Sequence, residues 1–345
     1  MCIARNKRDE PFGGINIIVA GDFAQLPPIT SGDVLYAGSV TSAPHSANSV
    51  HSQKAAAGKA LWHQFTTVVI LKQNMRQKSQ TANDGKLRKC LANMSYGACP
   101  DADIKLLNSR IVGRANGRPN LSDPRFHHVS IITSWNAHRD KINEVRSVQF
   151  AEEAGKSLQE LYSNDKWEAD VKESRKKKRG QAHEVNPKRI NNEINPFLKE
   201  TLWSLPHSCS QNHPGVLKLC IGPPVMIKRN LATECCVTNG AEGRVVGWKS
   251  KPLDDSGKMQ LETVFVELTC PPKPTQLERL PANVVPISQV AVATKCMMPN
   301  GKVLTINRDQ VPLVPNFAMT DYNSQGKTRP DNVVDLHNCR NHHSV

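Results

Sequence analysis

The sequence has 345 residues and a formal net charge of +14, because 45 lysines and arginines face only 31 acidic residues. This length allows about two compact domains. The excess of positive charge favours a polyanionic partner, nucleic acid first, although surface lysines often serve only solubility. No apolar run approaches the ~20 residues that span a bilayer, and the N-terminus lacks the apolar core of a secretory signal. We therefore expect no membrane partner.

The cysteines indicate reduced thiols inside the cell. The ten cysteines are scattered along the chain, and none belongs to a C-x-x-C pair. Cys339 lies close in sequence to His342 and His343, but no second pair of residues with the spacing of zinc ligands stands nearby. We expect no metal site from these groups.

The first part of the chain contains two short apolar runs. Ile15–Ala20 and Thr66–Leu71 are rich in isoleucine and valine, which is typical of strands buried on both faces of a parallel sheet. Residues 30–53 are small and polar without periodicity, so we expect a surface loop there. Ala55–Phe65 is predicted to form a helix between this loop and the second strand.

The middle of the chain alternates helical patterns with one further strand. Leu87–Met94 and Ala102–Val112 are predicted helices, and Val129–Thr133 is a predicted strand followed by another helix. Residues 151–215 are charged, dotted with prolines and poorly periodic. We expect a long loop or insertion there, with a few helical pieces.

From Leu217 the pattern changes to short strands. Leu219–Lys228 is predicted to form two strands broken by a glycine and two prolines, and Asn239-Gly240 is a strong tight-turn pair. Gly243–Trp248 and Thr263–Leu268 are strand-like, and Val290, Val292 and Thr294 occupy alternate positions, as in a strand. A small β domain is expected here, and a strand at Val333–Leu336 near the end.

Several phrases resemble the conserved motifs of one helicase family. PFGGINIIVAGDFAQLPPI (Pro11–Ile29) is similar, almost without interruption, to motif III of superfamily-one DNA helicases of the petite-integration-frequency (Pif) type. KQNMRQ (Lys72–Gln77) is similar to their motif IV. FAMTDYNSQGKT (Phe317–Thr328) is similar to motif V, but Tyr322 and Asn323 stand where the family usually has histidine and often has lysine.

The resemblance implies an α/β fold made of RecA-like P-loop NTPase helicase lobes, the first lobe partial, with a small SH3-like β insertion. Residues 1–75 would belong to the first lobe and 76–216 to the second lobe with a long basic insertion. Residues 217–314 would form the insertion of SH3 type, and 315–345 would return to the second lobe.

The same resemblance implies roles for individual residues. Asp22 and Gln25 would sense the terminal phosphate of ATP and the attacking water, and Arg76 would stabilise the transferring phosphate through its planar, charged fork. Nucleotide contacts would come from Gly21, Gln25, Arg76 and Gly326. DNA contacts would come from Asn136, Asn239, Gly240, Thr320, Ser324, Gln325 and Thr328.

Two motifs needed for ATP hydrolysis have no match in the sequence. The phosphate cradle G-x-x-x-x-G-K-[ST] is absent. Gly326-Lys327-Thr328 copies its last three letters, but Asp321 replaces the first glycine, and the phrase belongs to motif V. Asp9-Glu10 follows a basic segment rather than the apolar strand that precedes the Mg²⁺-binding pair. We expect ATP and Mg²⁺ to serve the full-length enzymes of the family and not to bind this polypeptide alone.

The main interpretation is therefore part of an ATP-dependent DNA helicase, moving 5′ to 3′ on single-stranded or forked DNA as a monomer. This helicase would act in DNA repair, recombination, telomere maintenance or transposition. Within the family, the sequence most resembles helicases of rolling-circle (Helitron-like) transposons. The alternative is a catalytically inactive remnant that binds single-stranded nucleic acid. A third interpretation is a truncated product that does not fold stably, because its sheet edges are exposed.

We expect a nuclear location, with the mitochondrion as the alternative. The basic run Arg175–Arg179 would serve as an import signal or, as often, form a solvated loop.

Overall fold

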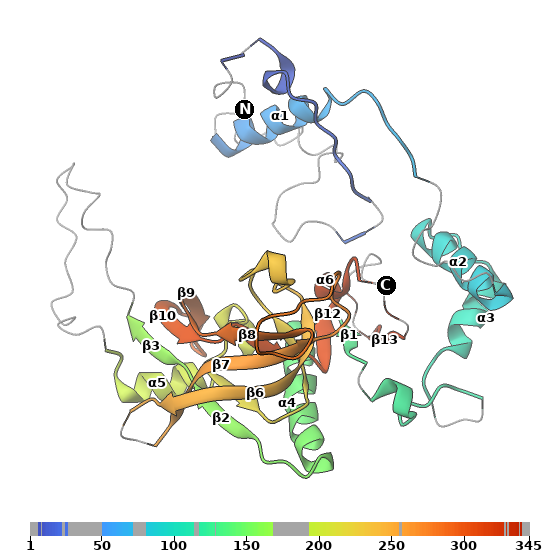
Figure 1. Ribbon diagram of the computed structural model, residues 1–345. Helices are drawn as coiled ribbons and strands as arrows, with labels where there is room; N and C mark the ends of the chain where they lie inside the picture. The colour runs from blue at the N-terminus through green and yellow to red at the C-terminus, as the bar shows by residue number, and fades with distance from the viewer. Residues whose placement is uncertain are drawn as a thin grey trace. The chain divides into compact units, whose positions relative to one another are not determined.

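The computed structural model describes residues 6–7, 9–22, 25–26, 50–71, 81–113, 117–127, 129–167, 193–254, 257–327, 329, 331–337 and 339 (Figure 1). Contacts between Cα atoms divide the chain into two compact units. The N-terminal unit comprises residues 1–120 and 341–345, and the C-terminal unit comprises residues 121–340. None of the described helices is long and apolar enough to cross a bilayer. The predicted domain boundaries after residues 75, 216 and 314 stay predictions.

Helices are the regular structure of the described N-terminal unit. They are the 3-10 turn η1 (Pro11–Gly13), α1 (Val50–Trp62), α2 (Ala82–Ser95) and α3 (Asp101–Ser109). These bounds confirm the three predicted helices, although α1 begins inside the predicted loop and α3 ends before Val112. Asn93 on α2 donates from Nδ2 to Asp103 Oδ2 on α3 at 2.7 Å, which joins the two helices.

The two apolar runs of this unit are not strands, and that prediction was wrong. Ile15–Ala20 and Thr66–Leu71 are irregular, and Ile18 and Leu71 are 94% and 89% exposed. A strand buries its side chains and pairs its backbone only when neighbouring strands lie beside it. The described part of this unit contains no strand, so the two runs have no neighbouring strand there with which to pair.

The C-terminal unit contains a parallel sheet with a long helix against it. Strand β1 (Ile131–Thr133) lies between β12 (Ala318–Thr320) and β13 (Val333–Asp335), parallel to both. Helix α4 (Asn136–Glu153) follows β1 and packs on this sheet. Asn143 of α4 accepts at Oδ1 from the Ala318 N–H at 2.8 Å and donates from Nδ2 to the Ala318 carbonyl at 3.1 Å. The predicted strands at 129–133 and 333–336 are confirmed.

A seven-stranded sheet, here called the β-module, forms most of the rest of the unit. Its strands are β2 (Gln159–Tyr162), β4 (Val216–Leu219), β5 (Pro224–Ile227), β6 (Glu242–Pro252), β7 (Met259–Leu268), β8 (Val284–Ser288) and β11 (Leu313–Pro315). They pair in the order β11-β5-β6-β7-β2-β4, with β8 also on β7. The long strands β6 and β7 run side by side in Figure 1. One apolar core inside the module includes Leu161, Leu217, Val245, Val266 and Ile287, all fully buried.

A second antiparallel sheet consists of β3 (Asn164–Trp167), β10 (Val303–Gln310) and β9 (Val290–Met297). Helix α5 (Pro196–Trp203) and the 3-10 turn η4 (His207–Ser210) accompany it. The prediction of a long loop over 151–215 was therefore wrong for β2 and β3, while 168–192 lies outside the described residues. The remaining short helices are η3 (Pro124–Phe126), η5 (Thr233–Cys235) and α6 (Asp321–Ser324).

A buried ion pair ties this second sheet together. Arg308 on β10 donates from Nε and Nη2 to the carboxylate of Asp165 on β3, at 2.9 and 2.7 Å, and both side chains are 0% exposed. Nη1 and Nη2 of the guanidinium also donate to the carbonyls of His213 and Leu202, at 3.0 and 3.2 Å respectively. Ser163 donates a further bond to Asp165 at 2.7 Å. Every charge in the group is thus satisfied within the protein.

Removing one partner of this pair should destabilise the C-terminal unit strongly. Arg308→Met leaves the Asp165 carboxylate buried without its partner, and such a loss costs about 3–5 kcal/mol. Urea unfolding of the purified chain measures the change in the free energy of unfolding. Arg279→Met, which removes an exposed guanidinium, should change it by less than about 0.5 kcal/mol. An unfolding free energy unaltered by Arg308→Met would contradict this account.

The buried His213 should make stability depend on pH. Burial and the nearby Arg308 charge lower its pKa from 6.5 to about 4. Between these values the unfolded chain binds a proton that the folded chain does not, so stability falls as the pH falls through this window and is constant above it. The loss reaches about 3 kcal/mol at the lower end. Urea unfolding across this range should show a shallower dependence in His213→Asn than in the parent chain, and equal slopes would refute the assignment.

Candidate nucleic-acid interface

Two predicted contact residues lie at one edge of the parallel sheet. Parallel strands end at the same edge, and the register pairs Thr133 of β1 with Thr320 of β12. Asn136, the first residue of α4, follows directly after β1 and is exposed. Thr320 is buried, and its hydroxyl accepts from Asn323 Nδ2 at 2.9 Å. The carboxyl edge of an open α/β sheet is where such folds place ligands.

The segment Thr320–Lys327, here called the edge segment, contains four of the predicted contacts. It consists of β12's last residue, the four-residue helix α6 and a short turn. Ser324 is half-buried, and Gln325 and Gly326 are exposed. Gly326 has φ +79°, a left-handed conformation that favours glycine. The segment therefore presents a tight, partly exposed turn beside the sheet edge.

The connection between β5 and β6, residues 228–241, provides the other two predicted contacts. The Gly240 N–H donates to the Ile227 carbonyl at 2.8 Å, and Gly240 has φ +88°. Asn239 is exposed, and its backbone N–H donates to Asn230 Oδ1 at 2.8 Å. The predicted turn at this pair is confirmed.

Side-chain contacts hold the edge segment against this connection. Lys327 donates from Nζ to the Gly240 carbonyl at 2.8 Å and pairs with the Glu242 carboxylate, which also pairs with Arg329. Lys228 Nζ reaches Asn323 Oδ1 at 3.4 Å. The structure therefore brings Thr320, Ser324, Gln325, Gly326 and Gly240 into one region of the C-terminal unit.

The electrostatics of this region are dominated by crowded cations. Burial, together with the nearby charges of Arg139 and Lys327, lowers the pKa of Lys228 to about 8. Burial also lowers the pKa of Lys327, while the Glu242 carboxylate opposes this effect. A cation with few water contacts and cationic neighbours gains from an added anion such as a phosphate oxygen. The region is thus suited to a phosphate backbone.

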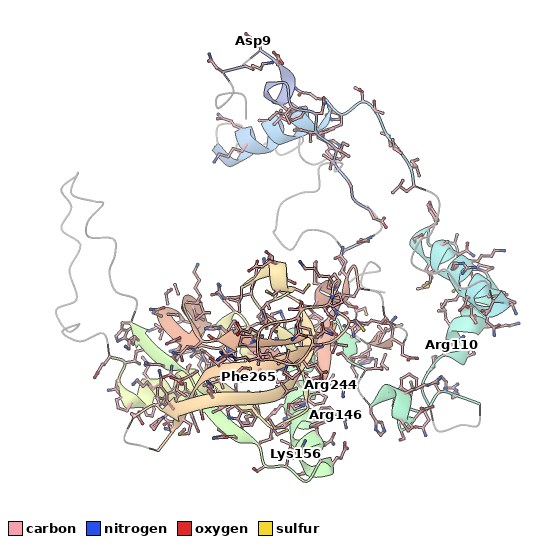
Figure 2. All side chains as sticks on the ribbon, viewed as in Figure 1. Asp9, Arg110, Arg146, Lys156, Arg244 and Phe265 are labelled. Atoms are coloured by element: carbon pink, nitrogen blue, oxygen red, sulfur yellow. The ribbon has the colours of Figure 1, made fainter. Side chains whose placement is uncertain are left out.

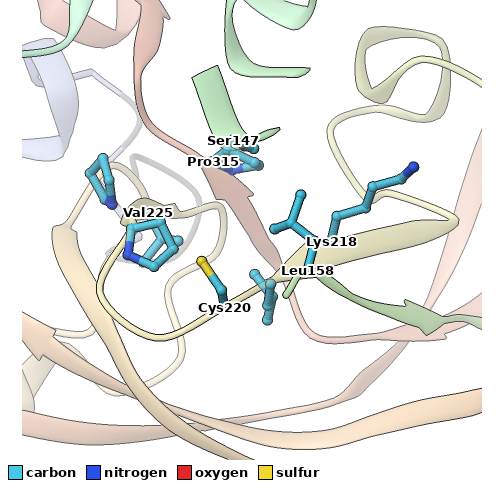
Figure 3. A pocket seen from close by; sticks show the side chains of 9 residues that line it. Ser147, Leu158, Lys218, Cys220, Val225 and Pro315 are labelled. Carbon is cyan, nitrogen blue, oxygen red and sulfur yellow. The ribbon is translucent and has the colours of Figure 1, made fainter. Parts of the chain in front are cut away.

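Other features of the C-terminal unit are less suited to a ligand. Arg146 and Lys156, labelled in Figure 2, lie in the second half of α4 and just beyond it. Arg146 pairs with Glu153 at 3.7 Å, and Lys156 donates to the Ile221 carbonyl at 2.8 Å. The pocket around Cys220 (Figure 3) has room for about one water molecule. Burial raises the pKa of the Cys220 thiol, which makes this side chain a poor nucleophile.

The predicted nucleotide contacts do not form a recognisable site in the described residues. Gly21, Asp22 and Gln25 lie in an exposed, irregular stretch, where Gln25 donates from Nε2 to Asp22 Oδ2 at 3.2 Å. This contradicts their predicted place at the end of a buried strand, because that strand does not form. Arg76 and Thr328 lie outside the described residues. The described residues contain no group of three or more side chains placed to hold a metal ion.

Sequence reasoning missed three charged residues of this region and misjudged a fourth. Lys228, Glu242 and Arg329 were not among the predicted contacts, and Lys327 was regarded only as part of a misleading P-loop ending. The available signal was weak: Lys228 is a cation that directly follows a buried apolar strand. The pairing of Glu242 with residues some 85 positions away leaves no local pattern.

A family model and a curated relative both relate the sequence of this chain to Pif1 helicases. Residues 1–103 match the family model described as PIF1-like helicase. The chain is 26% identical over 249 residues to the ATP-dependent DNA helicase PIF1 of Mus musculus, which covers 72% of this chain and 28% of the mouse protein. The chain thus spans less than a third of that relative's length.

Two solved structures share the fold. Pif1 helicase from Candida albicans has a TM-score of 0.54 at 20% identity, over 97% of this chain and 62% of that one. Pif1 helicase from Bacteroides, in complex with ADP-AlF3 and ssDNA, has a TM-score of 0.53 at 17% identity, over 96% and 58%. This likeness confirms the predicted RecA-like α/β helicase fold, while the SH3-like character of the β-module stays a prediction.

Replacing Lys228 should increase the stability of the chain and weaken its binding to DNA. Lys228→Met removes a charge that burial disfavours, so the free energy of unfolding at neutral pH should rise by about 1–2 kcal/mol, after allowance for partial exposure. The same change should weaken binding to a single-stranded oligonucleotide. Urea unfolding and fluorescence anisotropy measure the two effects. Lys251→Met, at an exposed lysine of the β-module, is the matched control and should change stability little.

Proposed function

We propose that this chain, which is related to the Pif1-type superfamily-one helicases, supplies a single-strand-binding part of an ATP-dependent DNA helicase. The observation that carries the proposal is the edge segment held against the 228–241 connection by Lys327, Glu242 and Lys228. This arrangement places a turn at a parallel sheet edge beside Lys228, a partly buried cation whose charge a phosphate would stabilise.

In this proposal the protein makes two kinds of contact with the phosphate backbone. Asn136, Ser324 and Gln325 would donate hydrogen bonds to phosphate oxygens, and Lys228 would supply fixed charge close to the backbone. Tyr322 is partly exposed on α6, where its ring would stack on a base or sugar. Such contacts do not read base edges, so the binding would depend weakly on sequence. The partner would be single-stranded or forked DNA, bound by a monomer.

ATP and Mg²⁺ would serve the complete helicase. A nucleotide site needs backbone N–H groups and a lysine around the phosphates, and the described residues Gly21, Asp22 and Gln25 are exposed and form no such cradle. The described residues therefore do not fit the nucleotide, and we derive no catalytic step from them. Translocation from 5′ to 3′ and a nuclear location are part of the proposal, as is a role in repair, recombination, telomere maintenance or transposition.

A second function, binding of single-stranded nucleic acid without ATP hydrolysis, has its own support. The sequence has no match to the P-loop motif, yet it has a net charge of +14. Both functions share the same binding surface, and they differ in whether the complete protein that contains this chain hydrolyses ATP. A DNA-stimulated ATPase measured on this polypeptide should be absent in either case, and a clear stimulated rate would contradict our assignment of the nucleotide site.

Binding to single-stranded DNA tests the proposal directly. Fluorescence anisotropy with a labelled oligothymidylate should show binding at low salt, with log affinity falling by ~0.7 per phosphate contact for each decade of salt. Titrations from ~50 to ~200 mM salt give this slope. Asn136→Ala should weaken binding severalfold, because it removes a donor at the sheet edge. An absence of affinity even at the lowest salt would refute the proposed function.

A further inference from the structure

Glu242 occupies a central place between the β-module and the edge segment. It is the first residue of β6, and its partly buried carboxylate pairs with both Lys327 and Arg329. Lys327 extends the contact by donating to the Gly240 carbonyl at 2.8 Å. One carboxylate therefore neutralises two cations, Lys327 at the end of the edge segment and Arg329 just beyond it.

The connection between β5 and β6 also contacts the edge segment at a second point, within helix α6. Lys228 begins the connection after β5 and reaches Asn323 of α6 at 3.4 Å, and Asn323 bonds Thr320 at 2.9 Å. Strands β5 and β6 pair with each other, with Met226 opposite Glu242. Both attachment points are therefore fixed by one hairpin of the β-module.

Without these attachments the edge segment would not be held in a single conformation. Helix α6 has four residues, and a helix that short is not stable by itself in water. Gly326 adds conformational freedom to the turn that follows. A binding loop that is ordered before the ligand arrives avoids the entropy cost of ordering it during binding.

We propose that Glu242 is a positioning residue for DNA binding, which acts through Lys327 and Arg329 to hold the edge segment in its binding shape. This inference rests on the proposed function, because it concerns the same surface. It assigns the two cations to an internal contact. Lys327 and Arg329 are only 24% and 14% exposed, and Lys327 already bonds a backbone carbonyl, so neither is placed to meet a phosphate.

The opposite role for Glu242 makes an opposite prediction. If its carboxylate masked two cations that otherwise bind DNA, its removal would strengthen binding and add up to two phosphate contacts. The salt slope would then steepen by about 0.7 for each contact. If Glu242 positions the segment, its removal weakens binding and leaves the salt slope unchanged.

The experiment compares Glu242→Ala with Glu262→Ala by anisotropy with labelled oligothymidylate. Glu262 is a carboxylate on β7 paired with Lys251 at 3.1 Å, so both variants add the same net charge. We expect Glu242→Ala to bind about tenfold more weakly than the parent chain with the same salt slope. Glu262→Ala should bind as tightly as the parent. Glu242→Gln, which keeps an acceptor but not the charge, should fall between them.

Unchanged affinity in Glu242→Ala, or tighter binding with a steeper slope, overturns the inference. Hydrogen exchange of the free protein provides a readout that does not need DNA: amides of residues 320–327 should exchange faster in Glu242→Ala and not in Glu262→Ala. If the parent chain fails to bind DNA, the proposed function fails, and this exchange difference still decides whether Glu242 orders the segment. Equal exchange in the two variants would also overturn the inference.

Discussion

The buried pair of Arg308 and Asp165 is the interaction on which the C-terminal unit most depends. Its charges would be costly inside the protein without partners, and here each guanidinium nitrogen and each carboxylate oxygen has at least one hydrogen bond. Asp165 lies three residues after the end of β2, and Ser163 between them accepts the indole N–H of Trp203 at 3.1 Å. The pair therefore fixes β3, α5 and β10 together and determines where β2 can join the β-module.

The β-module and the parallel sheet share a small apolar contact. Met226 of β5 and Val314 of β11 pack with Ile132 of β1 and Met319 of β12. All four side chains are buried, so a shift of one sheet against the other would open a gap in close-packed structure. Because the edge segment begins immediately after Met319, this contact sets its distance from the β5–β6 hairpin. The binding surface is thus formed by two sheets whose relative position is fixed by this contact.

Local patterns in the sequence were sufficient for some elements and insufficient for others. The strand at Val129–Thr133 and the turn at Asn239-Gly240 follow from composition and turn chemistry over a few residues. Ile15–Ala20 has an equally strong strand pattern, but a strand requires neighbours that a local pattern does not specify. Arg308 and Asp165 are 143 positions apart, and a charged residue in a polar stretch gives no sign that it will be buried. The contacts of the candidate site depended on the family resemblance, and the pairing that organises them required the fold.

The side-chain amide of Asn143 opposes self-association of the protein through strand β12. Among the described strands, β12 lies at one edge of the parallel sheet, and an open strand edge is a template on which another chain can add a strand. Both backbone groups of Ala318 are already bonded to Asn143. A side chain from the adjacent helix thus takes the place that a neighbouring strand would occupy. Self-association through this edge would first have to displace an amide that is buried inside the protein.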